Sequence, residues 1–362
     1  MKLCFFGSSL VSSYWNGAAT YYRGLLKEIA RLGYDITFYE PDAFERQAHR
    51  DIADPPWARV RVYPATSDGW QSALDKAARS ADLLVKASGV GVFDAELEAA
   101  VIDVPSKALR LYWDVDAPAT LDAIAARPDH HLRRAIPRYD LVLTYGGGDP
   151  VVTAYRGVGA RDCVPIYNAL DPQTHFPVTP VDKLGCDLGL LANRLPDREA
   201  RIEQFFLDVA ARMPERQFVL GGSGWESKGT PSNVRKVGHV GTGDHNAFFA
   251  SGLATLNVNR DSMARYGFSP PTRVFEAAGG GACLITDAWV GIDSFLEPGQ
   301  EVLVAASGDE VAEHLAALAL DRARAIAERA RKRILAHHTY RHRALQFSHL
   351  IEGISTKTEA AE

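Results

Sequence analysis

The stretch GFSPPTRVFEAAGGG, at residues 267–281, predicts a loop that runs into a short helix. Proline is well tolerated at the first turn of a helix, because its missing N–H would have no helical partner there, so Pro270 or Pro271 opens the helix. The helix carries one acid, Glu276, among apolar and small residues. Such an acid needs a polar partner.

The start of this predicted helix has the features of an anion site. Free backbone N–H groups and the positive end of the helix dipole attract negative charge. The hydroxyls of Ser269 and Thr272 and the guanidinium of Arg273 add donors beside Pro270. Glu276 lies one turn further on and would accept hydrogen bonds from both hydroxyls of a ribose. The stretch therefore predicts a site for a nucleoside diphosphate.

The alternative is that Glu276 faces solvent and that the loop is an ordinary connection, since short polar motifs often match by chance. The surrounding pattern favours the site. Apolar residues 282–286 follow the glycines as a buried strand, which places the helix inside a βαβ unit. In such sheets, ligands bind beyond the carboxyl ends of the strands.

Strand-type and helix-type runs alternate along the rest of the chain, which predicts the α/β class with parallel sheets. The N-terminal half opens with a strand at 3–6, a helix with apolar positions from Tyr22 to Leu32, and a strand at 36–39 after Gly33. Further strands are expected at 83–86, 108–113 and 141–145.

A proline-marked connector at 168–180 divides the chain, and a second alternating series follows it. The expected strands of this series are 186–191, 218–220, 234–237, 255–258, 282–286 and 302–305. We expect an N-terminal domain at 1–172, a C-terminal domain at 173–338, a helix at 339–354 that packs back on the first domain, and a loose tail at 355–362.

Composition narrows the functional classes. With 362 residues the chain suits two domains, and its net charge of −5 without a basic block argues against a nucleic-acid groove. The scattered Cys4, Cys163, Cys186 and Cys283 read as buried free thiols of a reducing compartment. We find neither a signal peptide nor an apolar run long enough for a membrane span, which predicts a soluble, cytoplasmic protein.

Several motifs together resemble one family. They are YWDVDAP at 112–118, DR at 197–198, the glycine loop at 221–224, GHV at 238–240, LNVNRD at 256–261, SPPTRVFEAA at 269–278 and DAW at 287–289. They resemble the CgeB-like (spore maturation protein CgeB) glycosyltransferases, and the resemblance covers nearly the whole chain.

This resemblance implies a GT-B fold, in which two Rossmann-like domains have parallel sheets facing across a cleft. It implies a glycosyltransferase of the hexosyltransferase type, with the nucleotide-sugar donor on the C-terminal domain and the acceptor on the N-terminal one. UDP is the default donor nucleotide, and the donor is a substrate, so no cofactor is expected. Retaining GT-B enzymes commonly have a second acid eight residues before the ribose-binding one. Here that position is Phe268, so retention is only slightly favoured over inversion.

The predicted donor site needs no metal if basic side chains and N–H groups neutralise the leaving diphosphate. Arg198 and Arg273 are the first choices for this role, with Arg194 and Arg260 behind them, for which surface ion pairs are the alternative. The loop at Gly222 and Ser223 lets the backbone approach a phosphate closely, and the backbone of Val240 would read the nucleobase.

In the N-terminal half, Asn16 and Gly17 are expected either to touch the donor diphosphate or sugar, or to be a helix cap followed by a flexible residue. Asp114 and Asp116 follow a strand and are the candidate catalytic residues. A carboxylate there would accept the proton of the attacking acceptor hydroxyl. We expect Asp114 to face the acceptor, with Asp116 structural as the cap of the helix near Pro118.

Two other functions compete with sugar transfer. A nucleotide-sugar 2-epimerase would also bind the donor but would need acids and histidines around the sugar and no acceptor. A non-catalytic nucleotide-sugar binding protein is the third possibility, against which the intact stretch from Ser269 to Glu276 argues. The acceptor, whether glycan, lipid-linked sugar, protein or small metabolite, is not implied by any motif.

Overall fold

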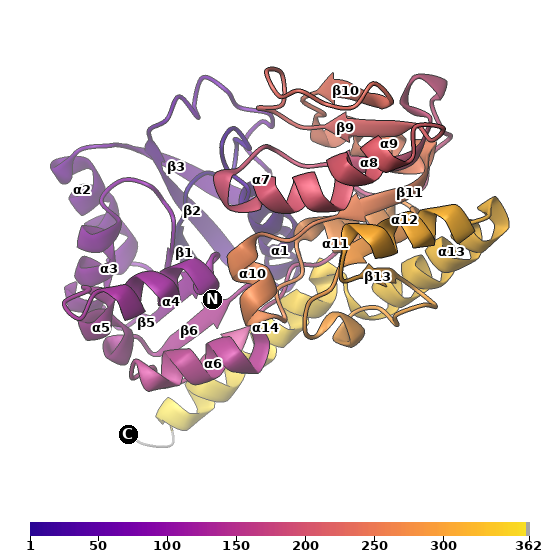
Figure 1. Ribbon diagram of the computed structural model, residues 1–362. Coiled ribbons are helices and arrows are strands. Elements are labelled where there is room, and N and C mark those ends of the chain that lie inside the picture. Colours follow the sequence, from indigo (N-terminus) through magenta and orange to yellow (C-terminus); the bar gives the residue numbers. More distant parts are fainter. Residues whose placement is uncertain (360–362) are drawn as a thin grey trace. The chain divides into compact units, whose positions relative to one another are not determined.

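A computed structural model describes residues 1–359, and their side chains as far as Ile354. The chain forms two compact units. Unit 1 consists of Met1–Tyr167 together with the chain from Tyr340 onward, and unit 2 is Asn168–Thr339. Figure 1 shows the strands of both units among the helices that connect them.

Unit 1 is built on a parallel sheet in the order β3-β2-β1-β4-β5-β6-β7. Its strands are β1 (Lys2–Phe6), β2 (Asp35–Asp42), β3 (Ala58–Pro64), β4 (Leu83–Ala87), β5 (Leu109–Asp114), β6 (Leu141–Thr144) and β7 (Cys163–Pro165). The central strand β1 aligns Phe5 with Phe38 of β2 and with Val85 of β4. All three side chains are buried, as expected for a parallel sheet covered on both faces.

The helices of unit 1 connect these strands and close the unit. They are α1 (Ala19–Arg31), α2 (Ser67–Ala78), α3 (Asp94–Asp103), α4 (Ala117–Ala126), α5 (Leu132–Ala135), the 3-10 turn η1 (Ile136–Arg138), α6 (Gly148–Gly157) and α14 (Tyr340–Glu359). Helix α14 packs on α1, where the ring of Tyr340 lies against Gly24. A Cβ at Gly24 would come within 2.2 Å of that ring, so this position needs glycine.

Unit 2 is built on a second parallel sheet in the order β10-β9-β8-β11-β12-β13. Its strands are β8 (Cys186–Leu191), β9 (Phe218–Gly221), β10 (Val234–Gly238), β11 (Gly252–Asn257), β12 (Leu284–Asp287) and β13 (Leu303–Ala305). A hydrophobic core that includes Leu190, Phe206, Leu256 and Ile285 packs on this sheet.

The helices of unit 2 are mostly short. They are η2 (Asp182–Leu184), α7 (Pro196–Ile202), the π-helical turn η3 (Glu203–Leu207), α8 (Asp208–Arg212), η4 (Thr242–Asp244), α9 (His245–Ser251), α10 (Asp261–Tyr266), α11 (Thr272–Gly279), η5 (Ile292–Ser294), α12 (Gly308–Ala317) and α13 (Leu320–His337). Helix α11 contains Glu276 and packs against α13.

These two parallel sheets confirm the predicted α/β class with two Rossmann-like domains. Strands β3 and β7 were not predicted. Strand β3 lies at an edge and alternates arginine with valine, and β7 has only three residues, so neither has the apolar run that marks a buried strand. The π-helical turn η3 joins α7 directly to α8.

The units change at Tyr167 and Tyr340, whereas the predicted domains change after 172 and 338. The earlier boundary arises because Leu170 already pairs with the end of unit 2, where its N–H donates to the carbonyl of His338. Residues 355–359, predicted as part of a loose tail, continue helix α14, and residues 360–362 lie outside the described residues.

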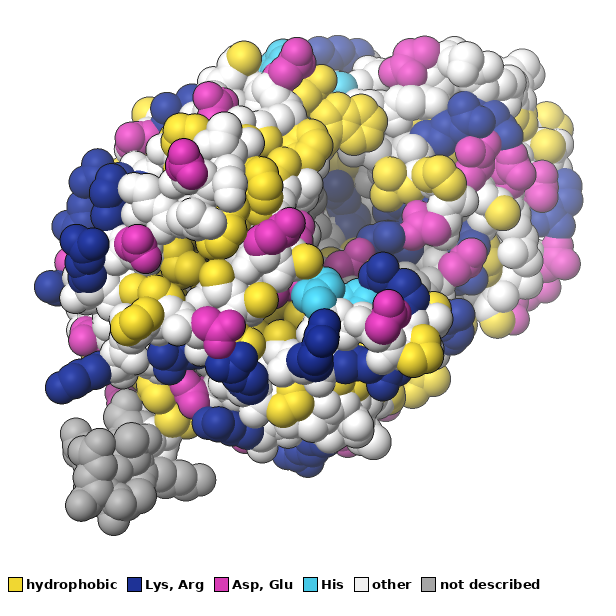
Figure 2. Space-filling view, turned by 90° about the vertical axis from the view of Figure 1, so that its left-hand side faces the viewer, with side chains coloured by type: hydrophobic (Ala, Val, Ile, Leu, Met, Phe, Trp, Pro, Cys, Tyr) yellow, Lys and Arg dark blue, Asp and Glu magenta, His cyan; other side chains and the backbone are white. Residues whose placement is uncertain are grey.

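Among the residues that the structure describes, no helix combines the length and the apolar character of a membrane span. On the face that Figure 2 shows, Lys and Arg side chains are interspersed with Asp and Glu side chains, without one large field of either sign. The four cysteines are free; three are buried, and Cys186 is partly exposed.

Candidate functional site

The candidate site of unit 2 lies where its sheet order reverses. Strands β8 and β11 are neighbours, but the chain leaves them toward β9 and β12 on opposite sides. A parallel sheet binds ligands at the carboxyl ends of such a strand pair. Here the loop after β8 leads to Arg198 on α7, and the loop after β11 contains Asn259 and Arg260.

Three buried N–H groups at this point have no hydrogen-bond partner among the described residues: Arg198 Nε, Arg201 Nε and Asn259 Nδ2. Arg198 uses only Nη2, which donates to the carbonyl of Asn193 at 2.8 Å. Arg201 Nη2 donates to Asp287 at 2.6 Å. Arg201 Nε lies 3.7 Å from the Asp261 carboxylate, which balances its charge. An unsatisfied buried donor costs about 1–3 kcal/mol, so the other two favour a ligand with acceptor atoms.

The charge around Arg198 supports an anionic ligand. Burial, followed by the nearby positive charge of Arg273, lowers the pKa of Arg198 to about 10. Arg260 acts in the same direction, while Asp197 opposes it. A guanidinium held among other cations in a partly dry site is stabilised when an anion binds.

Helix α11 begins at Thr272, one residue after the prolines that were expected to open it. Pro271 is its N-cap, and no side chain caps the first turn. The loop before it is held from inside, because Asn168 Nδ2 donates to the carbonyl of Pro270 at 3.2 Å and Ser269 Oγ donates to the carbonyl of Gly267 at 2.9 Å. Ser269 therefore shapes the loop, and the first turn at Thr272 is left without a capping side chain.

Glu276 is buried on this helix, and the alternative that it faces solvent is wrong. Its Oε2 accepts a hydrogen bond from Arg273 Nη1 at 2.8 Å. Burial by itself would raise the pKa of Glu276, but Arg273, His175 and His245 together hold it below its ordinary value. Glu276 is thus an ionised acceptor inside the unit.

Two histidines complete the surroundings of Glu276. His175 Nε2 lies 3.3 Å from His245 Nδ1, and Arg273 Nη1 lies 3.3 Å from the same atom. His245 also hydrogen-bonds the backbone at Val240. His245 therefore joins the segment predicted to read the base, at Val240, to the Arg273–Glu276 pair on α11.

His175, His245 and Glu276 also have the composition of a metal site, since one ligand atom from each lies within 4.8 Å of the others. The Arg273 guanidinium, however, is hydrogen-bonded to both Glu276 and His245. This cation already supplies the positive charge that a metal would bring, so the donor set fits a hydrogen-bonded network better than a metal centre.

The network predicts a pH-dependent stability. Burial, followed by repulsion from Arg273, lowers the pKa of His245 to about 4, and burial also lowers the pKa of His175. In the unfolded chain these histidines bind protons near pH 6.5, whereas in the folded chain they bind them only at lower pH. The stability that the neutral histidines contribute is therefore complete above about pH 6.5 and is lost as the pH falls toward 4.

We expect His245→Asn to remove on the order of 2 kcal/mol of the stability difference between pH 7 and pH 5. Urea denaturation at both pH values measures it, and an equal pH dependence in both proteins would contradict it.

The glycine loop after β9 packs closely on the loop after β8. Gly222 has φ of +127°, and a Cβ there would lie 2.1 Å from the carbonyl oxygen of Ala192, so only glycine fits. The Gly222 N–H donates to the carbonyl of Gly238, and the Ser223 N–H donates to Asn193 Oδ1. Both N–H groups are thereby used within unit 2, whereas Val240 remains half-buried.

The second-choice arginines have carboxylate partners. Arg194 forms two 2.8 Å hydrogen bonds with Glu199, and Arg260 Nε donates to Asp197 at 2.5 Å. The ion-pair alternative therefore describes Arg194 well. Arg260 is paired too, but it also lies close enough to Arg198 to lower the pKa of that guanidinium.

In unit 1, burial argues against the predicted role of Asp114. Its side chain is inaccessible to solvent and accepts hydrogen bonds from Ser88 at 2.7 Å, Thr120 at 3.1 Å, the Asp116 N–H at 2.9 Å and the Tyr155 hydroxyl. These donors fill its oxygens and fix the end of β5. Asp116 precedes α4 at the N-cap position, but its side chain makes no capping hydrogen bond and is partly exposed. Of the two acids, Asp116 is therefore the one that an acceptor can reach.

Asn16 holds the loop after β1 together. Its Nδ2 donates to the carbonyls of Ser9 and Ser12, and its Oδ1 accepts from Ser8 Oγ. Helix α1 begins after Ala18, so Asn16 is not its cap. Gly17 is exposed, and no atom lies within 4 Å of a Cβ placed there, so its backbone is open to a ligand.

Sequence reasoning missed His175, Arg201 and Asn259. His175 lies in the proline-marked connector, where no periodic pattern marks a buried residue. Asn259 lies in the LNVNRD motif just beyond β11, and Arg201 lies on α7, three residues after Arg198. These positions were the available signal. Phe268, with φ of +44°, packs its ring over Gly291, so this position is structurally occupied by an aromatic side chain.

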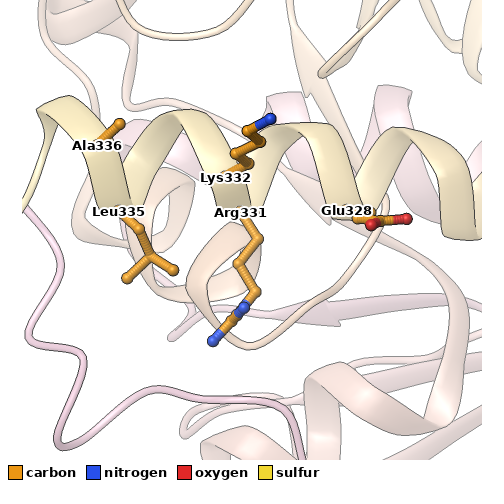
Figure 3. A pocket seen from close by; sticks show the side chains of 5 residues that line it. All are labelled: Glu328, Arg331, Lys332, Leu335 and Ala336. Atoms are coloured by element: carbon orange, nitrogen blue, oxygen red, sulfur yellow. The ribbon is translucent and has the colours of Figure 1, made fainter.

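A surface pocket on helix α13 does not belong to this site. Figure 3 shows its lining residues Glu328, Arg331, Lys332, Leu335 and Ala336 on that one helix. Lys332 points to the opposite side from Arg331 and Leu335, so the polar groups do not converge on a ligand.

Comparison with known proteins identifies similar folds for the whole chain and a similar family for its C-terminal part. Residues 198–349 match the family model described as glycosyl transferase-like. No curated protein matches the chain by sequence. Sucrose-phosphate synthase from Thermosynechococcus elongatus superposes with a TM-score of 0.72 at 14% identity, over 99% of this chain and 100% of that one.

Two further structures agree. HepE of Anabaena, in complex with UDP-glucose, has a TM-score of 0.68 at 15% identity over 98% of this chain and 100% of its own. Trehalose-6-phosphate synthase from Burkholderia multivorans has a TM-score of 0.66 at 12% identity over the whole of both chains. The chain has the GT-B fold, with two Rossmann-like domains.

Proposed function

We propose that this chain is a glycosyltransferase of the hexosyltransferase type, related to the CgeB-like enzymes, which transfers a sugar from a nucleoside-diphosphate donor to an acceptor. The observation that carries the proposal is the pair of buried donors without a hydrogen-bond partner, Arg198 Nε and Asn259 Nδ2, close to the ionised Glu276. HepE of Anabaena and the T4 phage enzyme BGT were both solved with UDP-glucose, which makes a UDP-sugar the first donor to test.

Each part of the donor has a counterpart in unit 2. Arg198 and Arg273 neutralise the diphosphate, with the uncapped first turn of α11 beside them. Glu276 accepts hydrogen bonds from the ribose hydroxyls. Its Oε2 either keeps the hydrogen bond from Arg273 beside a ribose hydroxyl or gives it up to that hydroxyl. The backbone near Val240, held by His245, contacts the base.

The reaction breaks the bond between the anomeric carbon and the β-phosphate oxygen, and the electron pair leaves with the nucleoside diphosphate. The acceptor oxygen forms the new bond to that carbon on the face that the diphosphate leaves, and its proton passes to a phosphate oxygen of the leaving group. Arginines in the site stabilise the charge that develops on the leaving diphosphate, so no divalent metal is needed. We propose retention at the anomeric carbon, although Phe268 replaces the usual first acid.

The test is incubation of the protein with UDP-sugars and a mixture of sugar acceptors, followed by NMR of the products. We expect release of UDP and a new glycoside with the donor's anomeric configuration, at the same rate in excess EDTA as in buffer. A rate abolished by EDTA and restored by Mn²⁺ would contradict the metal-independent chemistry. An isomerised nucleotide sugar would identify an epimerase, and an unchanged donor that still binds would identify a binding protein.

A further inference from the structure

Unit 1 exposes aromatic side chains at one edge of its sheet. Tyr14 and Trp15 follow β1 and Phe44 follows β2, with 39%, 70% and 51% of their surfaces exposed. Only one other phenylalanine, tyrosine or tryptophan is exposed among the described side chains, Phe176 of unit 2. We name Tyr14, Trp15 and Phe44 the aromatic rim.

The aromatic rim lies where the sheet order of unit 1 reverses. Strand β1 lies between β2 and β4, so the loops after these three strands meet at the carboxyl edge, where ligands of α/β sheets bind. The loops contact each other directly. The Tyr14 ring stacks on His49 with centroids 4.1 Å apart, and Phe44 packs against Gly91, where a Cβ would lie 2.7 Å from the ring.

Backbone strain gathers at the same edge. Five described residues other than glycine have positive φ, and four of them, Trp15, Phe44, Glu45 and Phe93, lie in these loops. A bulky residue in the left-handed region costs about 1–2 kcal/mol. For Trp15 and Phe44 this cost is combined with exposure to water, and a ligand that covers the rings would offset part of both.

Polar groups beside the rim narrow the chemistry of that ligand. Arg46 is 6% exposed, its guanidinium lies over the Phe44 ring at 4.9 Å, and its buried Nε has no hydrogen-bond partner among the described residues. Beside Tyr14, Asp51 accepts hydrogen bonds from Ser13 and Arg23. The surface therefore combines aromatic faces with an unsatisfied donor and a charged acceptor at its border.

A pyranose ring has matching chemistry. Its C–H face stacks on an aromatic ring, while its hydroxyls at the edge both donate and accept hydrogen bonds. A lipid or other purely apolar group would leave Arg46 Nε unsatisfied. We propose that the aromatic rim of unit 1 binds a sugar ring of the acceptor, with Trp15 as the main stacking surface, so that the acceptor substrate is a carbohydrate. The inference rests on the proposed sugar transfer only where it identifies the bound sugar as the acceptor. The binding of a sugar to the aromatic rim does not depend on that proposal.

The test uses tryptophan fluorescence, because Trp15 is the exposed tryptophan among the described side chains. Titration with cellobiose, maltose and N,N′-diacetylchitobiose is expected to change the emission of the wild-type protein saturably with at least one of them. Trp15→Ala should lower the affinity for that sugar at least tenfold when measured by calorimetry, and Trp15→Phe should lower it less than threefold. Phe176→Ala is the matched control and should bind the sugar like the wild type.

The inference is overturned if none of the sugars binds, if Trp15→Ala binds as tightly as the wild type, or if phosphatidylcholine vesicles change the emission and the sugars do not. A parallel titration with UDP separates the two proposals. UDP binding without sugar binding would contradict the carbohydrate acceptor alone, whereas sugar binding without UDP binding would support the rim and contradict the proposed donor.

Discussion

Arg198→Met is expected to lower kcat for sugar transfer at least a hundredfold while leaving the free energy of unfolding within about 1 kcal/mol of the wild type. The loss of turnover follows because a cation placed at the leaving diphosphate stabilises charge that appears only in the transition state. Stability is retained because this guanidinium is partly buried, repelled by Arg273, and bonded only through Nη2. A buried charge that contributes little to the stability of the free protein but much to turnover is characteristic of a functional site.

Arg194→Met is the matched control for this change. Arg194 lies four residues earlier, but its Nε and Nη2 both donate to Glu199. We expect its kcat to remain within about threefold of the wild type, because an ion pair that water screens contributes little. Steady-state kinetics and urea denaturation of both variants measure the contrast. Equal losses of kcat in both variants, or a large loss of stability in Arg198→Met, would contradict the assignment.

Glu276→Gln is expected to raise the Kd for UDP by about 10- to 100-fold, which corresponds to about 1.4–2.7 kcal/mol. The reason is that an ionised carboxylate accepts hydrogen bonds roughly twice as strongly as a neutral amide oxygen. Calorimetric titration measures this change, and the melting temperature of the variant shows whether α11 stays folded.

A second nucleotide makes the Glu276 test specific. 2′,3′-Dideoxy-UDP lacks both ribose hydroxyls, so it should bind the wild type and Glu276→Gln with nearly equal affinity. The double-mutant cycle then assigns the lost free energy to the contact between Glu276 and the ribose. If Glu276→Gln weakens the binding of UDP and of the dideoxy analogue by the same factor, Glu276 acts on the fold of the site and does not bind the ribose.

Local patterns were sufficient to predict most of the fold. Apolar runs identified the buried strands, because a strand of a parallel sheet is covered on both faces. The short edge strands β3 and β7 lack this covering and therefore this signal. The boundary near Tyr167 depends on the pairing of Leu170 with His338, a contact between distant segments that no local pattern shows.

The site was predicted unevenly for a similar reason. The motif around Glu276 predicted the start of α11 and its acid, because both depend on neighbouring residues. The partners of Asp114 come from three other segments, at Ser88, Thr120 and Tyr155, and the sequence could not show that they surround it. His175 approaches His245 across 70 residues of chain, so only the structure brings it to the site.

The most direct test of the account is the binding of nucleoside diphosphates to the purified protein. A thermal-shift screen compares UDP, GDP, dTDP, ADP and CMP and their common sugar conjugates, because a ligand that binds the native state raises the melting temperature. The account predicts a clear, saturable rise with one nucleoside diphosphate, UDP first, and a much smaller rise in Arg198→Met. No rise with any of these nucleotides would contradict the donor site in unit 2 and the proposed sugar transfer with it.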